Sequence, residues 1–138
     1  EAISKLHNQM ALDYTQKMIL VKKSAVLSKP IVLCMDYIYS HINHRITVND
    51  LAEYAGLSPS YLSRLFKKVM GEGCNEYVVN RRIEKSKLLL ETTSIRTSQI
   101  SEAVGYKDTN YFSLAFKKNT GLSPTKYREM KQKLQGKS

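Results

Sequence analysis

The chain contains nearly the same eleven-residue segment twice. Residues 61–71 read YLSRLFKKVMG and residues 111–121 read YFSLAFKKNTG. The similarity extends to both sides, at an offset of 49 residues before the segment and 50 residues within and after it, because the second copy carries one additional residue. An internal repeat of this period indicates one supersecondary unit built twice. The fold must therefore contain two similar small units within 138 residues.

The first copy contains the start and stop signals of two short helices. Thr47, with Asp50 three residues later, forms the capping box that begins a helix. Gly56 can adopt the positive φ that ends a helix. Ser58 can cap a second helix that has Pro59 at its first position. Two helices joined by a short turn containing Gly form a helix-turn-helix, so the repeat predicts two of these motifs.

The apolar pattern is helical almost throughout, which predicts an all-α fold. We expect two helix-turn-helix subdomains, at about 47–70 and 97–119, joined by a long linker helix at about 75–91. Residues 1–28 carry an apolar stripe at steps of three or four residues and are expected to form an N-terminal connector or dimerisation helix. The alternative for this segment is a helix packed on the domain formed by residues 29–138.

The chain is strongly basic, with a formal net charge of +10 from 22 Lys and Arg against 12 Asp and Glu. A small domain of this charge typically meets DNA, RNA or an anionic membrane, although the charge can also serve solubility alone. No apolar run approaches the roughly 20 residues needed to span a bilayer, so we expect no membrane partner. Cys34 and Cys74 lack zinc-ribbon spacing and fit a reducing cytoplasm.

The sequence contains none of the common catalytic or nucleotide-binding motifs, and we expect neither an enzyme nor a cofactor. His41 and His44 have the i, i+3 spacing of metal ligands, but no acidic or Cys residue lies close to them in sequence. We interpret them as exposed histidines at the end of a helix and expect no metal site.

The second helix of each motif has one apolar face and one face suited to DNA. In the first copy Leu62, Leu65, Phe66 and Val69 are expected to be buried, and in the second Phe112, Ala115 and Phe116. The outer positions carry hydroxyls, an amide and cations, with no acid among them. We expect base contacts from Ser60, Ser63, Arg64, Thr109, Asn110, Ser113 and Leu114, and phosphate contacts from Ser58, Lys67, Arg81 and Lys117.

Individual side chains on these faces suit particular bases. Arg64 can donate two hydrogen bonds to guanine, Asn110 suits adenine, and Leu114 suits the thymine methyl group. Recognition helices placed about one DNA turn apart enter successive major grooves. In the linker helix, Lys85 and Lys87 are interpreted as solvated, and one of the two arginines, Arg81 or Arg82, is expected to hold the helix to a neighbouring unit.

Three stretches together resemble the AraC/XylS family of bacterial transcription regulators, over roughly residues 31–129. They are ITVNDLAEYAGLSPSYLSRLFKKVMG, the linker EYVVNRRIEKSKLLL, and ISEAVGYKDTNYFSLAFKKNTGLSPTKYR. The most specific part is the family's G-x-S-P-x-x-Y-R ending, which runs here from Gly121 to Arg128. Two positions depart from the family pattern: Leu114, where many relatives have Arg, and Gly73-Cys74, where relatives more often have a capping Ser or Thr followed by a large apolar residue.

The resemblance implies seven helices, promoter binding at asymmetric sites, and usually activation through contact with RNA polymerase. It also implies a separate effector-binding, dimerisation or receiver domain, commonly N-terminal. The chain begins with Glu1 rather than Met, so we expect a fragment whose residues 1–28 belong to a connector, with homodimerisation through them or through the missing domain. The alternative function is a helical RNA-binding or protein-interaction module that uses the basic face. Neither the operator, the signal nor the regulated genes follow from the sequence.

Overall fold

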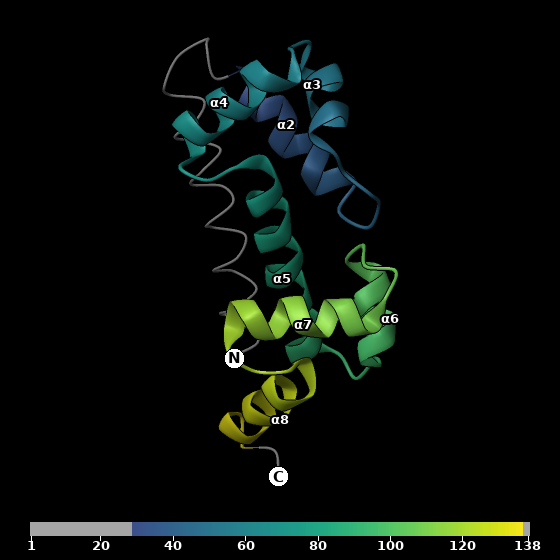
Figure 1. Ribbon diagram of the computed structural model, residues 1–138. Coiled ribbons are helices and arrows are strands. Elements are labelled where there is room, and N and C mark those ends of the chain that lie inside the picture. The colour runs from purple at the N-terminus through teal and green to yellow at the C-terminus, as the bar shows by residue number, and fades with distance from the viewer. Residues whose placement is uncertain (1–28, 137–138) are drawn as a thin grey trace. The chain divides into compact units, whose positions relative to one another are not determined.

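The computed structural model describes residues 29–136, which form seven α-helices and no strand (Figure 1). The described residues divide into two compact units, 29–81 and 82–136. This confirms the all-α prediction with two helix-turn-helix motifs, while the prediction for residues 1–28 lies outside the described range. The helices are α2 (Lys29–Ser40), α3 (Val48–Ala55), α4 (Pro59–Met70), α5 (Cys74–Thr92), α6 (Thr97–Ala103), α7 (Thr109–Thr120) and α8 (Pro124–Leu134).

The first helix-turn-helix, α3 and α4, has the caps that its sequence predicts. The Thr47 hydroxyl accepts a hydrogen bond from the Asp50 backbone N–H at 3.1 Å, and the Asp50 carboxylate accepts one from the Thr47 N–H at 3.0 Å. Gly56 ends α3 with φ of 75°. The Ser58 hydroxyl caps α4 by accepting a bond from the Tyr61 N–H at 3.3 Å. These bonds satisfy helix-end groups that would otherwise lack partners.

The second helix-turn-helix, α6 and α7, starts with different caps. The Gln99 side-chain oxygen accepts from the Arg96 backbone N–H at 3.1 Å at the start of α6. The Asp108 carboxylate accepts from the Asn110 N–H at 2.9 Å at the start of α7. The turn between the helices spans residues 104–108, against residues 56–58 in the first motif, because it contains the additional residue of the second copy and because α6 ends one residue earlier than α3. The motif is repeated, with Gly71 and Gly121 ending α4 and α7 alike, although its N-capping residues are not.

The core of the first unit gathers side chains from α2, α3, α4 and the start of α5. The buried residues are Ile31, Cys34, Met35, Ile38, Ile42, Leu51, Ala52, Leu62, Phe66, Cys74, Tyr77 and Val78. The Tyr77 ring meets the Phe66 ring edge-on, with centroids 5.4 Å apart. Cys74 begins α5 with only 4% of its surface exposed.

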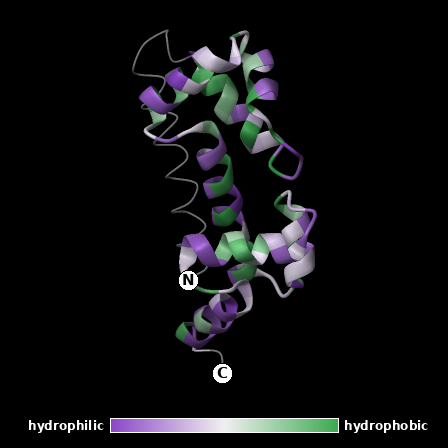
Figure 2. Cartoon of the chain, viewed as in Figure 1, coloured by the Kyte–Doolittle hydropathy of each residue, from purple (hydrophilic) through white to green (hydrophobic). Residues whose placement is uncertain are grey.

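The second unit repeats this arrangement with the end of α5, and with α6, α7 and α8. Its buried side chains include Ile83, Ser86, Leu90, Ile100, Val104, Phe112, Phe116 and Tyr127. The Tyr127 ring meets the Phe116 ring edge-on at 5.4 Å, as Tyr77 meets Phe66 fifty positions earlier. Helix α5 thus contributes to both cores, and Figure 2 shows hydrophobic and hydrophilic stretches alternating along it. Although α5 is 19 residues long, no helix in 29–136 qualifies as a bilayer span.

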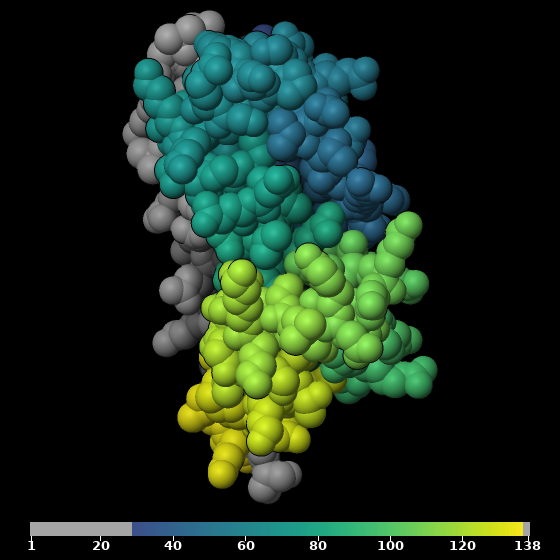
Figure 3. Space-filling model, viewed as in Figure 1, coloured from purple at the N-terminus to yellow at the C-terminus, as the bar shows by residue number. Residues whose placement is uncertain are grey.

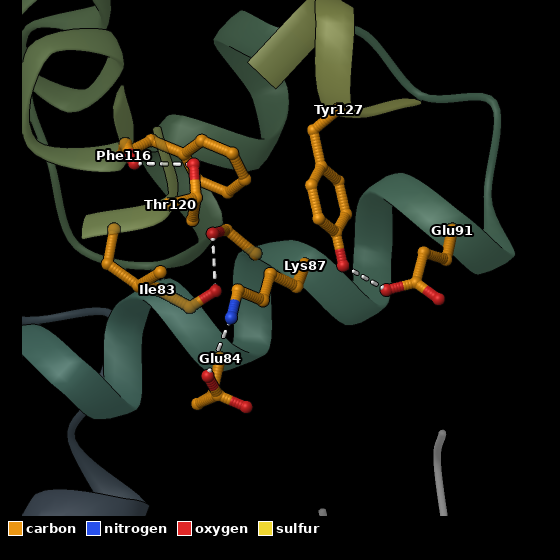
Figure 4. Close-up of polar contacts among 8 residues, drawn as sticks. Ile83, Glu84, Lys87, Glu91, Phe116, Thr120 and Tyr127 are labelled. Carbon is orange, nitrogen blue, oxygen red and sulfur yellow. Dashed lines mark hydrogen bonds and ion pairs between the residues drawn. The ribbon is translucent and has the colours of Figure 1, made fainter. Parts of the chain in front are cut away.

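Two side chains of α8 fasten it to the C-terminal end of α5. The Tyr127 hydroxyl donates a hydrogen bond of 2.6 Å to the Glu91 carboxylate (Figure 4). Burial, and then this bond, raise the pKa of Tyr127. The Arg128 guanidinium donates to the backbone carbonyls of Leu90 at 3.0 Å and Thr93 at 3.1 Å. These carbonyls lie at the end of α5, where helix acceptors lack intrahelical donors. The Tyr-Arg pair of the G-x-S-P-x-x-Y-R ending therefore stabilises the fold.

We predict that Tyr127→Phe destabilises the chain by about 1–3 kcal/mol, because it removes the only hydrogen-bond donor seen on the buried Glu91 carboxylate within residues 29–136. Urea unfolding followed by circular dichroism measures the loss. The matched control is Tyr61→Phe, since Tyr61 is 44% exposed and the change should stay within about 0.5 kcal/mol. Adding Glu91→Leu to Tyr127→Phe should recover part of the loss, because it removes the buried unpaired charge. An unchanged midpoint for Tyr127→Phe would show that the bond contributes nothing.

Both cysteines should be poor nucleophiles in the folded chain. Burial raises the pKa of Cys34 to about 12 and also raises the pKa of Cys74. We predict that iodoacetamide at pH 8 alkylates both thiols far more slowly in the folded chain than in urea. A raised folded pKa favours the neutral thiol, so its contribution to stability is complete below the unfolded pKa and is lost as pH rises from about 9 towards 12. Cys34→Ala should reduce this alkaline loss. Rapid alkylation of the folded chain would contradict the prediction.

Candidate nucleic-acid interface

Helix α4 presents the predicted polar face to solvent. Leu62 and Phe66 are fully buried and fix the helix on its unit, while Leu65 and Val69 are partly buried. The residues expected to meet DNA are all exposed: Ser58, Ser60, Ser63, Arg64 and Lys67. The Ser58 oxygen already accepts the cap bond, but its hydroxyl hydrogen stays available for a phosphate.

Helix α7 presents a similar face with a different composition. Phe112 and Phe116 are fully buried, and Ala115 is half-buried. Of the predicted contact residues, Asn110, Leu114 and Lys117 are exposed, whereas Thr109 and Ser113 are half-buried. The side chains of α7 form part of the surface seen in Figure 3. The helix therefore offers an amide, a cation and an apolar group to a partner.

Neither recognition helix contains an acidic residue. The last turn of α4 carries Lys67 and Lys68, and the last turn of α7 carries Lys117 and Lys118. None of these four lysines forms an ion pair within the described residues. Each helix thus has a positive end beside its polar face, which is the arrangement that attracts phosphate groups.

Tyr61 and Tyr111 also lie exposed on these helices, although the sequence analysis assigned them no contact. Tyr61 is 44% exposed and Tyr111 is 65% exposed. Each precedes an expected base-contact residue by three positions, since Arg64 follows Tyr61 and Leu114 follows Tyr111. Residues at this spacing adjoin on a helix surface. That spacing is a sequence signal for their position beside the contact face, but it did not show whether their rings are exposed.

The adjacent arginines of α5 are both half-buried and each lies over a tyrosine. The guanidinium carbon of Arg81 lies 5.2 Å from the centre of the Tyr77 ring. That of Arg82 lies 5.5 Å from the centre of the Tyr106 ring, and Arg82 donates a hydrogen bond to the Gly105 carbonyl at 3.3 Å. Burial lowers the pKa of Arg82. Arg82 therefore holds α5 to the turn before α7, as expected for one of the two, while phosphate contact by Arg81 stays a prediction.

The two histidines differ in their surroundings. His44 is exposed, as expected, but His41 is half-buried. The His41 ring stacks on Tyr37 with centroids 4.1 Å apart, and its Nδ1 lies 2.9 Å from the Tyr37 carbonyl oxygen. Within the part of the chain that the structure describes, no group of His, Cys, Asp or Glu has the arrangement of a metal site.

Comparisons with known proteins agree with this geometry. A family model described as a helix-turn-helix domain matches residues 51–130. The chain is 38% identical over 93 residues to the arabinose operon regulatory protein of Escherichia coli (strain K12), a match that covers 67% of this chain and 32% of that protein. The chain spans about a third of the length of several curated relatives.

Solved structures show the same arrangement of helices. The C-terminal domain of the two-component response regulator yesN from Fusobacterium nucleatum is 39% identical with a TM-score of 0.68, over 70% of this chain and 94% of that one. The DNA-binding domain of AdpA, solved in complex with a target DNA, has a TM-score of 0.75 over 79% of this chain and 98% of that one. At 20% identity the AdpA structure shares the fold.

The geometry predicts stability effects of different size for substitutions of two arginines. Arg82→Ala should destabilise the chain by about 1–2 kcal/mol, because it removes a hydrogen bond and a cation–π contact. Arg64→Ala should change stability by less than about 0.5 kcal/mol, because Arg64 is exposed on α4. Urea unfolding of both variants beside the parent chain measures the difference. Equal losses for the two variants would contradict the structural role given to Arg82.

Proposed function

Because the chain belongs to the AraC family of helix-turn-helix transcription regulators, we propose that it binds promoter DNA sequence-specifically and serves as the DNA-binding part of an activator. The family consists of regulators and not of enzymes. The observation that carries the proposal is the repeated helix with a buried apolar face and an exposed, acid-free polar face, α4 in one unit and α7 in the other. A helix of this kind fits the major groove, whose base edges accept and donate hydrogen bonds.

In the proposed complex α4 reads bases through Arg64, with Ser60 and Ser63 beside it. A guanidinium donates two parallel hydrogen bonds to guanine O6 and N7, and a serine hydroxyl can pair with several base edges. Ser58 and Lys67 lie at the two ends of the helix and bind phosphates. The first unit therefore has both the group that selects a base and the groups that position the helix on the backbone.

In the second unit α7 reads bases through Asn110 and Leu114, with Lys117 on a phosphate. Thr109 and Ser113 are half-buried, so they contribute less contact area than the corresponding groups of α4. The two helices enter successive major grooves, and α5 continues from one unit into the next. Arg81, on α5, contributes a further phosphate contact. The target is then a site in two parts about one turn apart.

The remaining partners follow from family membership alone. We propose contact with RNA polymerase as the route to activation. Homodimerisation through residues 1–28, or through a further domain, is also proposed, but those residues lie outside the described range.

We predict that Arg64→Ala weakens binding to a selected DNA site by about 1–3 kcal/mol and relaxes base selectivity at one position. The site is first obtained by selecting bound duplexes from a random pool with the 138-residue chain. Affinities of parent and variant are then measured at fixed salt, by fluorescence anisotropy, for that site and for all single-base changes in it. An unchanged affinity for the selected site would show that α4 is not a reading helix in the way proposed.

Lys67→Ala and Lys117→Ala are the matched controls, since each removes one exposed cation from a recognition helix. They should weaken binding to all duplexes similarly and lower the slope of log K against log salt by about one. Structured RNA of equal length is the competing ligand. If it binds as tightly as the selected duplex at the same salt, the chain is an RNA-binding module instead.

A further inference from the structure

Helix α7 exposes two large apolar side chains beside each other on its outer face. Leu114 is 70% exposed and Tyr111 is 65% exposed. They are three positions apart and therefore adjoin on the helix surface. Helix α4 has the charged Arg64 at the position that corresponds to Leu114. Both helices expose a tyrosine, Tyr61 or Tyr111, but the residue three positions later is charged in α4 and apolar in α7.

The ring of Tyr111 contacts Tyr106, a residue of the turn that precedes α7. It lies 5.9 Å from the Tyr106 ring, and Tyr106 is only 9% exposed. Tyr106 is held in turn by two neighbours. The centroid of the Phe112 ring lies 5.5 Å from that of Tyr106, and the Arg82 guanidinium lies over the Tyr106 ring. The Tyr111 ring is therefore held in place before any partner arrives, which lowers the entropy cost of binding.

The charges around the pair favour a polyanion as the partner. Lys107, Lys117 and Lys118 are exposed, and so is the amide of Asn110. The nearest acid in the sequence is Asp108, whose carboxylate caps α7 by accepting from the Asn110 backbone N–H. In the major groove the thymine 5-methyl group is the apolar feature, and an A·T pair presents it together with the adenine N6 and N7 groups. Leu114 suits the methyl and Asn110 suits the adenine.

We propose, on the premise of the DNA-binding function above, that α7 selects A·T base pairs by seating thymine methyl groups against Leu114 and Tyr111. Asn110 lies four positions before Leu114 and so adjoins it on the same face. Both residues then favour the same kind of base pair. Arg82 and Tyr106 act as positioning residues for Tyr111. The two units thereby select different bases, since α4 recognises guanine and α7 recognises A·T base pairs.

The first step of the test removes a methyl group from the DNA and uses the parent chain. In the site selected for the 138-residue chain, each thymine is replaced singly by deoxyuridine, which differs only in lacking the 5-methyl group. At one or two positions in one half of the site, the parent chain should lose about fourfold in affinity, the effect of uncovering one methyl group. Leu114→Ala should bind the thymine and uracil duplexes equally at such a position.

Arg64→Ala is the matched control, because it weakens the other recognition helix and should keep the fourfold thymine preference. Leu114→Met should keep part of it, since the side chain stays apolar. Circular dichroism should show the parent fold for every variant, because Leu114 and Arg64 are exposed. A Leu114→Ala chain that retains the full thymine preference would overturn the inference.

Failure of the inference can be told from failure of the proposed function. If a selected site binds tightly but every uracil duplex binds as well as its thymine counterpart, DNA binding stands and thymine reading is wrong. If Leu114→Ala alters self-association in sedimentation and leaves the thymine preference intact, the apolar pair serves a protein partner and the inference is again wrong. If no duplex is selected at all, the proposed function itself fails.

Discussion

Both helix-turn-helix motifs depend on burial against helices outside the motif, α2 and α5 in the first unit and α5 and α8 in the second. Helices of 7 to 12 residues, such as α6 and α4, are too short to be stable alone in water, so their stability must come from packing an apolar face. Helix α5 supplies part of this surface in both units, with Tyr77 and Val78 in one core and Ile83 and Leu90 in the other. Because α5 packs in both cores, its apolar residues do not form one continuous face. This packing also explains why its two central arginines are half-buried.

The two units share an aromatic contact in the interior and differ on the exposed face. The edge-on contact of Phe66 with Tyr77 recurs as that of Phe116 with Tyr127, at the same centroid distance of 5.4 Å. A close-packed core tolerates little change of shape, and this limits what can vary at these positions. The exposed face has no such limit, so Arg64 in one copy can correspond to Leu114 in the other. The fold is repeated, and the chemistry offered to DNA is not.

Much of the architecture could be predicted from local signals. The Thr47–Asp50 capping box, the left-handed Gly56 and the buried Leu62 and Phe66 all follow from spacing along the chain. The capping of α7 by Asp108 was not predicted, because the Ser-Pro pair that marks the start of α4 is replaced by Asp-Thr at the corresponding positions of the second copy. The histidine prediction was right for His44 and wrong for His41. Stacking on Tyr37, one helical turn away, covers part of the His41 ring.

The sequence alone determined the all-α class, the two motifs and the face of each recognition helix, because these depend on contacts within a few residues. The tertiary structure decided which charged and aromatic side chains are structural. Arg82 contacts the Gly105 carbonyl 23 residues away, and Tyr127 reaches Glu91 across 36 residues. No periodicity encodes such long-range pairs. Tyr111 likewise became a candidate for DNA contact only once its ring was found exposed and supported by Tyr106.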